Sequence, residues 1–139
     1  MIQTLKKRIL IVDDDPDVGE MSSEVLASAG FEAARANTCA EAMAKMALQQ
    51  ADVLLLDIEL PDECGLEFLP KFKAFHPQIP VIILTGLGYD EAKMQVALRE
   101  GASGFVSKAV PPENMVLAIR NALRNTSDET ADFHDGAGS

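Results

Sequence analysis

Short runs of branched apolar residues recur along this chain, and they constrain its fold more than any other feature. The runs are Ile9–Val12, Val53–Leu56, Val81–Leu84 and Phe105–Val106, with a weaker one, typical of an edge strand, at Phe31–Ala36. Apolar runs without polar alternation are typical of strands that are buried on both faces of a parallel sheet. Five strands are therefore predicted.

The segments between these runs carry apolar residues at a spacing near 3.6, which predicts helices. The first helix ends at Gly30, and Thr38 and Glu41 are spaced as a capping box at the start of the second. The remaining helices are predicted over about residues 66–75, 90–100 and 112–124. Because parallel strands need right-handed crossovers, this alternation predicts an α/β fold, a five-stranded doubly wound parallel sheet with helices on both faces.

The length of 139 residues suits one domain, which we expect to span residues 1–124. After Arg124 the apolar periodicity ends, and residues 125–139 contain no basic residue. This segment is predicted to be a flexible acidic tail or the stump of a linker.

The composition argues against several classes of function. A net charge of −10 disfavours direct binding of nucleic acid through a basic surface. No apolar run approaches the roughly 20 residues that span a bilayer, and the N-terminus shows no signal-peptide cleavage site. Cys39 and Cys64 form no CxxC pair, so we expect reduced thiols. A cytoplasmic protein without membrane contact is predicted.

Polar residues follow the apolar runs at the end of each predicted core strand. Asp13 and Asp14 follow the first strand, and Asp57 follows the third. Thr85 ends the fourth strand and Lys108 the fifth. The carboxyl edge of a doubly wound sheet is where ligands bind. If the first strand lies beside the third, three carboxylates converge at this edge and repel one another.

A divalent cation would relieve this repulsion, and Mg²⁺ prefers oxygen ligands of this kind. Lys108 supplies a second, permanent positive charge. Asp57 is best placed to act as a nucleophile that forms an aspartyl phosphate, because it ends a central strand before an open loop. The cation and the lysine would stabilise the charge of the transferring group, and the Thr85 hydroxyl would donate to a phosphoryl oxygen.

Taken singly, these residues have ordinary structural explanations. Asp13 or Asp14 is a possible helix cap, Asp57 a turn residue, Thr85 a strand-end hydroxyl and Lys108 a solvated surface lysine. Their joint occurrence at four strand ends favours a functional site.

With these motifs the sequence resembles a receiver domain of the two-component response regulators, over residues 8 to about 124. The motifs are ILIVDD with Asp13 and Asp14, DVLLLDIELPDECGLEFL with Asp57, VIILTG with Thr85, and GASGFVSK ending at Lys108. The resemblance implies the flavodoxin-like strand order 2-1-3-4-5. It also implies that Asp57 is the phosphoacceptor, and that the chain is a signalling protein which catalyses only its own phosphorylation and slow dephosphorylation.

The resemblance further implies a ligand set for Mg²⁺. Asp14 would bind the ion directly, Asp13 through water or by its charge, and Asp57 through its carboxylate. The backbone carbonyl of Glu59 would supply the third protein ligand, and Lys108 would pair with the phosphoryl group.

By the same resemblance, Thr85 and Phe105 would be switch residues. The hydroxyl moves toward the phosphoryl group, the ring turns inward, and the surface around the fourth and fifth helices is remodelled. The implied partners are a sensor histidine kinase or phosphotransfer protein, and a downstream protein or fused output domain. A phosphorylation-dependent homodimer is a further possibility.

Three positions depart from the pattern of the family. Ala109 stands where a cis-proline often follows the lysine, so a trans bond and a different loop shape are expected. Glu59 places a carboxylate two residues after the acceptor, with an effect on dephosphorylation of undetermined sign. Asp15 adds an acid that we interpret as a helix N-cap.

Two other functions fit parts of the pattern. A phosphatase of the haloacid-dehalogenase type also uses a strand-end aspartate, with an acid two residues later where Glu59 stands. In that class, however, the nucleophile precedes the acidic pair, whereas Asp13 and Asp14 come first here. A receiver-like module that binds partners without being phosphorylated is the other alternative.

Overall fold

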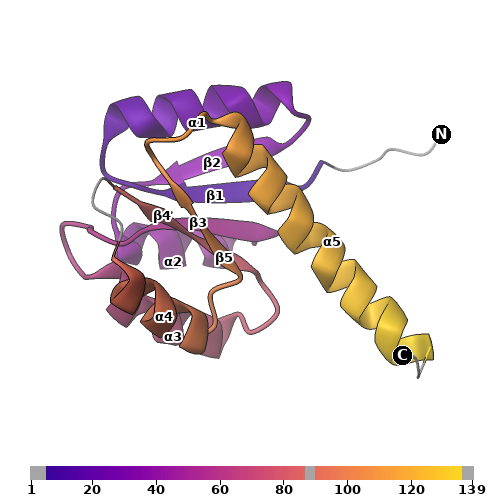
Figure 1. Cartoon of the computed structure of the whole chain (residues 1–139). Coiled ribbons are helices and arrows are strands. Elements are labelled where there is room, and N and C mark those ends of the chain that lie inside the picture. The colour runs from indigo at the N-terminus through magenta and orange to yellow at the C-terminus, as the bar shows by residue number, and fades with distance from the viewer. Residues whose placement is uncertain (1–5, 87–89, 136–139) are drawn as a thin grey trace.

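A computed structural model of the chain describes residues 6–86 and 90–135. Strands and helices alternate strictly along the chain (Figure 1). Their bounds are β1 Arg8–Val12, α1 Pro16–Ser28, β2 Glu32–Ala36, α2 Cys39–Leu48, β3 Val53–Asp57, α3 Gly65–Phe75, β4 Val81–Thr85, α4 Glu91–Arg99, β5 Gly104–Ser107 and α5 Glu113–Asp135. The five predicted strands are thus confirmed. No helix of the described ranges is both long and apolar enough to cross a membrane.

The strands form one parallel sheet in the order β2-β1-β3-β4-β5. This order confirms the doubly wound, flavodoxin-like topology that the resemblance implied. The chain moves from β1 to the edge at β2 and then returns past β1 to β3. The topological switch point therefore lies between β1 and β3, where a doubly wound sheet opens a ligand-binding crevice at its carboxyl edge.

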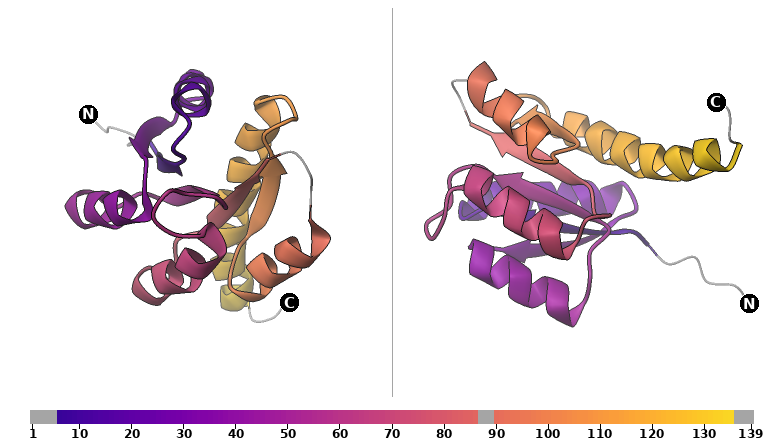
Figure 2. Two further views of the ribbon diagram at one scale, coloured as in Figure 1. Left: turned by 90° about the vertical axis from the view of Figure 1, so that its left-hand side faces the viewer. Right: turned by 90° about the horizontal axis from the view of Figure 1, so that it is seen from below.

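The two faces of the sheet bury alternate residues of the same strands. Leu10, Leu54 and Ile83 pack against α2, α3 and α4, whereas Ile11 and Leu55 pack against α1 and α5. Figure 2 shows the sheet between these two layers of helices. Because β1, β3 and β4 bury both faces, their sequences are continuously apolar rather than alternating.

Side chains cap the starts of α1 and α2. The carboxylate of Asp15 accepts a hydrogen bond from the N–H of Asp17, so Asp15 is the N-cap of α1, as predicted. Thr38 caps α2 by accepting from the N–H of Glu41 at 3.0 Å. The Glu41 carboxylate bonds to the N–H of Asn37 at 2.7 Å, one residue before the position that a capping box requires.

The fifth helix is longer than predicted. It continues past Arg124 to Asp135, so the predicted end of this helix at Arg124 is wrong. That residues 125–139 are a flexible acidic tail or the stump of a linker stays a prediction, and residues 136–139 lie outside the described ranges. The loss of apolar periodicity suggested an earlier end. A helix keeps its backbone hydrogen bonds without a buried face, however, and the first glycine or proline after Glu113 is Gly136.

Gly65 allows the start of α3 to lie directly against the end of β3. Its N–H donates to the carbonyl oxygen of Ile58 at 2.5 Å. A Cβ at this position would stand 2.9 Å from the Cα of Ile58 and would also collide with the carbonyl oxygen of Asp57. Because both neighbours are backbone atoms, neither can move without displacing the strand end that carries Asp57.

We predict that Gly65→Ala lowers the free energy of unfolding by about 1–3 kcal/mol, the usual cost of overpacking a tight contact. Urea unfolding followed by circular dichroism measures this change. Gly104→Ala is the matched control, because a Cβ there would have no atom within 4 Å. Equal stability of the two variants would contradict the steric argument.

Candidate functional site

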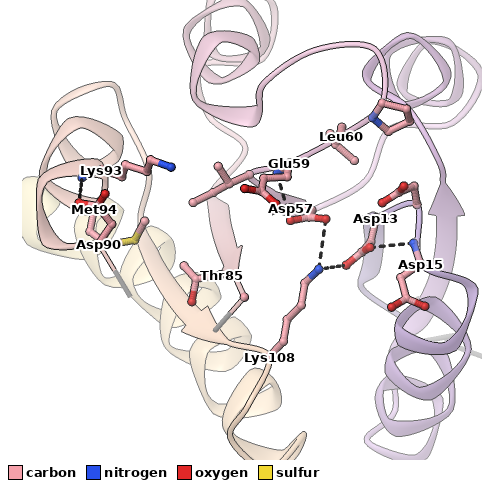
Figure 3. A pocket seen from close by; sticks show the side chains of 14 residues that line it. Asp13, Asp15, Asp57, Glu59, Leu60, Thr85, Asp90, Lys93, Met94 and Lys108 are labelled. Atoms are coloured by element: carbon pink, nitrogen blue, oxygen red, sulfur yellow. Dashed lines mark hydrogen bonds and ion pairs between the residues drawn. The ribbon is translucent and has the colours of Figure 1, made fainter. Parts of the chain in front are cut away.

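An open cavity of about 500 Å³ lies at the carboxyl edge of the sheet (Figure 3). Its lining includes the five residues predicted from the strand ends: Asp13, Asp14, Asp57, Thr85 and Lys108. The strand register explains their convergence. Val12 pairs with Leu56, which places Asp13 level with Asp57, and Thr85 pairs with Ser107, next to Lys108. The predicted gathering of these strand ends is thus present in the structure.

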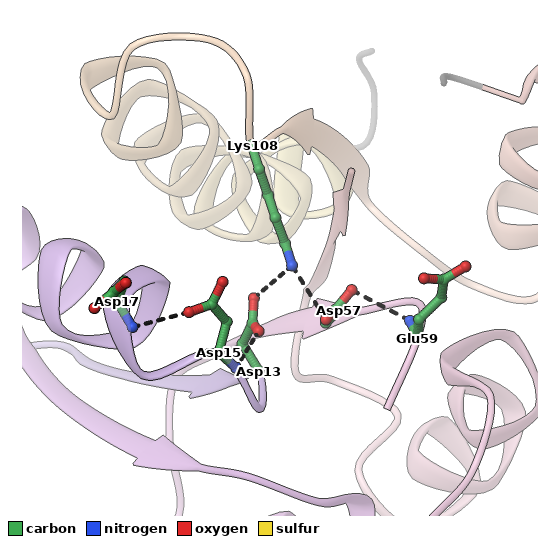
Figure 4. A network of polar contacts seen from close by, with 6 residues as sticks. All are labelled: Asp13, Asp15, Asp17, Asp57, Glu59 and Lys108. Atoms are coloured by element: carbon green, nitrogen blue, oxygen red, sulfur yellow. Dashed lines mark hydrogen bonds and ion pairs between the residues drawn. The ribbon is translucent and has the colours of Figure 1, made fainter. Parts of the chain in front are cut away.

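Lys108 lies between the two buried carboxylates of the cavity (Figure 4). Its ammonium group is 2.8 Å from Oδ2 of Asp13 and 3.1 Å from Oδ2 of Asp57. Asp13 is 4% exposed and Asp57 is 6% exposed, so water screens these charges poorly. Lys108 is therefore part of the site, and the alternative explanation that it is a solvated surface lysine does not hold.

Backbone N–H groups orient the other oxygen of each carboxylate. Oδ1 of Asp13 accepts a hydrogen bond from the N–H of Asp15 at 2.9 Å, and Oδ1 of Asp57 accepts from the N–H of Glu59 at 3.2 Å. Asp13 thus bonds within its own turn, and the cap of α1 is Asp15. The bonds to Asp15 and Glu59 direct both Oδ2 atoms toward Lys108.

Burial and charge shift the titration of these groups in a consistent way. Burial, and then the negative charge of Asp13, raise the pKa of the Asp57 carboxyl, although Lys108 and the N–H of Glu59 act against them. Burial would lower the pKa of Lys108, but its hydrogen bond to Asp13 and the charge of Asp57 outweigh burial and raise that pKa. Lys108 thus stays protonated, and Asp57 carries its charge at an energetic cost.

The acidic residues have the geometry of a cation site. One carboxylate oxygen from each of Asp13, Asp14 and Asp57 lies within 4.8 Å of the others. A purely carboxylate donor set suits a hard cation such as Mg²⁺. Asp14 is exposed, and this leaves room for the water molecules that Mg²⁺ usually retains. These residues therefore fit the predicted cofactor.

The structure adds residues that the strand ends did not indicate. Asp90, Lys93 and Met94, from the first turn of α4 and its N-cap, also line the cavity. Figure 3 shows the Lys93 side chain directed from α4 toward the middle of the cavity. The predicted start of this helix at Asp90, together with the sheet topology, would have placed them at the same edge.

Thr85 connects the acidic cavity to a second hollow. It is 5% exposed and lines both the acidic cavity and a groove of about 450 Å³ between β5 and α5. Phe105 lines that groove and is 38% exposed. The two predicted switch residues thus border one groove.

The three departures noted in the sequence occupy distinct positions. The described residues contain no cis peptide bond, so the bond between Lys108 and Ala109 is trans, as expected. Glu59 is exposed at the rim of the cavity. Asp15 caps α1 and also lines the cavity.

Comparison with known proteins identifies the class that this fold and site define. Residues 9–120 match the response regulator receiver domain family, and the chain belongs to this family of two-component signalling domains. A CheY-like receiver domain protein from Methanospirillum hungatei superposes with a TM-score of 0.83 at 33% identity, over 90% of this chain and 99% of that one. The receiver domain of NtrX from Brucella abortus gives a TM-score of 0.79 at 30% identity, over 84% of this chain and 98% of that one.

Among relatives by sequence, the probable transcriptional regulatory protein TcrX of Mycobacterium tuberculosis is 36% identical over 89% of this chain and 53% of its own length. The phosphate regulon transcriptional regulatory protein PhoB of Pseudomonas aeruginosa is 34% identical over 86% of this chain and 53% of its own length. The chain therefore spans about half the length of these relatives.

We predict that Asp57→Asn stabilises the metal-free protein at pH 7, because the neutral amide avoids the cost of burying a charge beside Asp13. The raised pKa means that the folded protein holds this proton more tightly than the unfolded chain. Stability is therefore lost as the pH rises from the ordinary value of 3.8 through the raised value. Urea unfolding in a chelating buffer should show a larger gain at pH 7 than at pH 4.

The matched control for this prediction is Asp14→Asn, which neutralises an exposed acid of the same cluster and should change stability less. An Asp57→Asn variant that gains as much at pH 4 as at pH 7 would contradict the assigned cause.

We predict that Lys108→Ala tightens Mg²⁺ binding about tenfold, or ~1.4 kcal/mol. The substitution removes a positive charge that lies 2.8 Å and 3.1 Å from two of the oxygens available to the cation. Calorimetric titration suits this measurement, because the chain contains no tryptophan. Lys93→Ala, which removes the lysine on the α4 side of the cavity, should have a smaller effect. If Lys108→Ala instead bound Mg²⁺ more weakly, the idea that the Lys108 ammonium group competes with the cation for the carboxylates would be wrong.

Proposed function

We propose that this protein accepts a phosphoryl group on Asp57 from a phosphohistidine of a partner kinase or phosphotransfer protein. The observation that carries the proposal is the position of the Lys108 ammonium group between two buried carboxylates at the topological switch point. Membership of the receiver family supports the same reaction.

The reaction would proceed by attack of an Asp57 carboxylate oxygen on phosphorus. A new O–P bond forms as the N–P bond of the phosphohistidine breaks, and the imidazole nitrogen keeps the electron pair and takes a proton from water. The Lys108 ammonium group would exchange its contact with the Asp57 carboxylate for one with the phosphoryl oxygens, and the Thr85 hydroxyl would donate a hydrogen bond to one of these oxygens. Both groups lie at the cavity that would receive the phosphoryl group.

Asp13, Asp14, Asp57 and the backbone carbonyl of Glu59 would hold Mg²⁺. When bound, the ion supplies positive charge that offsets the repulsion between the carboxylates and the incoming phosphoryl group. The fit of the first three residues rests on their convergent oxygens. The role of the Glu59 carbonyl rests on the family resemblance, and the position of Glu59 on the cavity rim is compatible with it.

We propose that phosphorylation switches a partner-binding surface through Thr85 and Phe105. The half-exposed Phe105 ring borders a groove that also reaches Thr85, so a shift of the hydroxyl would open space for the ring. The readers of this surface would be a downstream protein, a fused output domain or a second copy of the chain. A fused output domain is consistent with relatives about twice as long, two of them named transcriptional regulatory proteins.

We expect the intact protein to gain one phosphoryl group when it is incubated with acetyl phosphate and Mg²⁺. Asp57→Asn and a sample with chelated metal should gain none, because the first lacks the nucleophile and the second lacks the cation. Intact-mass spectrometry measures all three samples directly.

Two other results would favour the alternative functions. Absence of an adduct, together with absence of Mg²⁺ binding, would favour a binding module that works without phosphorylation. Sustained turnover of p-nitrophenyl phosphate would favour a phosphatase, since a phosphoacceptor catalyses only its own phosphorylation and slow dephosphorylation.

A further inference from the structure

Asp62 lies in the loop of residues 58–64, which joins β3 to α3, but its carboxylate bonds to a different helix. Oδ1 accepts a hydrogen bond from the N–H of Cys39, and Oδ2 accepts one from the N–H of Ala40, both at 3.1 Å. These are the first two N–H groups of α2, which have no partner within that helix. The N–H of Glu41 bonds to Thr38 instead. The first turn of α2 is therefore capped twice, once by its own N-cap residue and once by this loop.

The electrostatics favour a charged carboxylate at this position. Asp62 is exposed, so burial raises its pKa only slightly, and backbone N–H groups, those of Cys39 and Ala40 first, outweigh burial and lower the pKa. The positive end of the helix dipole adds to the attraction. Asp62 is thus an ionised group that accepts two charge-assisted hydrogen bonds.

The same loop forms one wall of the acidic cavity. Ile58, Glu59, Leu60 and Pro61 all line the cavity. At its base, the loop is closed by the bond between Gly65 and Ile58. At its tip, Glu63 pairs with Lys71 at 2.5 Å, which joins the loop only to α3, the helix into which the loop leads. Asp62 joins the loop tip to α2, which is neither of the two elements that this loop connects.

We propose that Asp62 is a positioning residue for the phosphoryl site: its two bonds to α2 hold the loop so that the Glu59 carbonyl stays in place for Mg²⁺. This inference rests on the proposed function. Asp62 touches neither the metal nor the phosphoryl group; it acts through the backbone between residues 59 and 62. Outer contacts that orient metal ligands commonly change metal affinity 10- to 100-fold when they are removed.

The chain offers a matched control, because the Thr38 hydroxyl caps the same helix turn from within α2's own N-cap position. Asp62→Ala and Thr38→Ala each remove N-capping from α2, but only Asp62→Ala also removes the two hydrogen bonds that join the loop tip to α2. The experiment measures Mg²⁺ affinity by calorimetric titration and the rate of phosphorylation by acetyl phosphate as a function of Mg²⁺ concentration, with urea unfolding of each variant in parallel. It uses the full chain throughout.

We expect Asp62→Ala to need about tenfold more Mg²⁺ for half-maximal rate and to approach the wild-type rate at saturation. Thr38→Ala should keep the wild-type Mg²⁺ dependence although its unfolding midpoint falls. Asp62→Asn, with one accepting oxygen in place of two, should lie between wild type and Asp62→Ala. It also provides the test if Asp62→Ala does not fold.

The outcomes separate this inference from the proposed function. A wild-type protein that accepts no phosphoryl group would overturn both. A wild-type protein that responds to Mg²⁺, with Asp62 variants that share its Mg²⁺ dependence, would overturn the positioning role alone and leave Asp62 as a helix cap.

Discussion

The site depends on the ionic contact of one lysine with two buried aspartates. Asp13 and Asp57 end adjacent strands at the same level, where burial and mutual repulsion oppose their ionisation. Lys108 reaches both carboxylates from the end of β5 and balances part of their charge. A buried charge without a partner costs several kcal/mol. The arrangement therefore holds β1, β3 and β5 in one geometry, and it leaves a pocket whose acidic residues outnumber its basic ones.

Backbone groups in the surrounding loops orient the two carboxylates of this contact. The N–H groups of Asp15 and Glu59 orient the two carboxylates, and Gly65 brings α3 close enough to close the loop after β3. The loop carries much of one wall of the cavity and is joined to α2 by Asp62. Asp62 thus joins the segment after Asp57 to a helix into which this loop does not lead.

Local pattern predicted the elements well, and its failures share a cause. The limits of α3 and α4 agree with the prediction to within one residue. For α4 the signals are local, because Asp90 caps its start and Gly101 follows its end. The end of α5 was missed because apolar periodicity reports burial, whereas the helix continues to Asp135 through a segment without glycine or proline. The Asp62 cap was missed because it joins residues 22 and 23 positions apart, and a capping motif is recognised only between near neighbours.

The order of residues along the chain was enough to determine the alternating strands and helices, the buried character of β1, β3 and β4, and the polar group at the end of each core strand. These features follow from local periodicity and from the cost of burying charge. Strand order and register decided the rest. They set Asp13 level with Asp57, brought Lys108 across from β5, and placed Lys93 on the cavity wall. Such contacts join residues far apart in the chain, so their geometry exists only after the sheet has assembled.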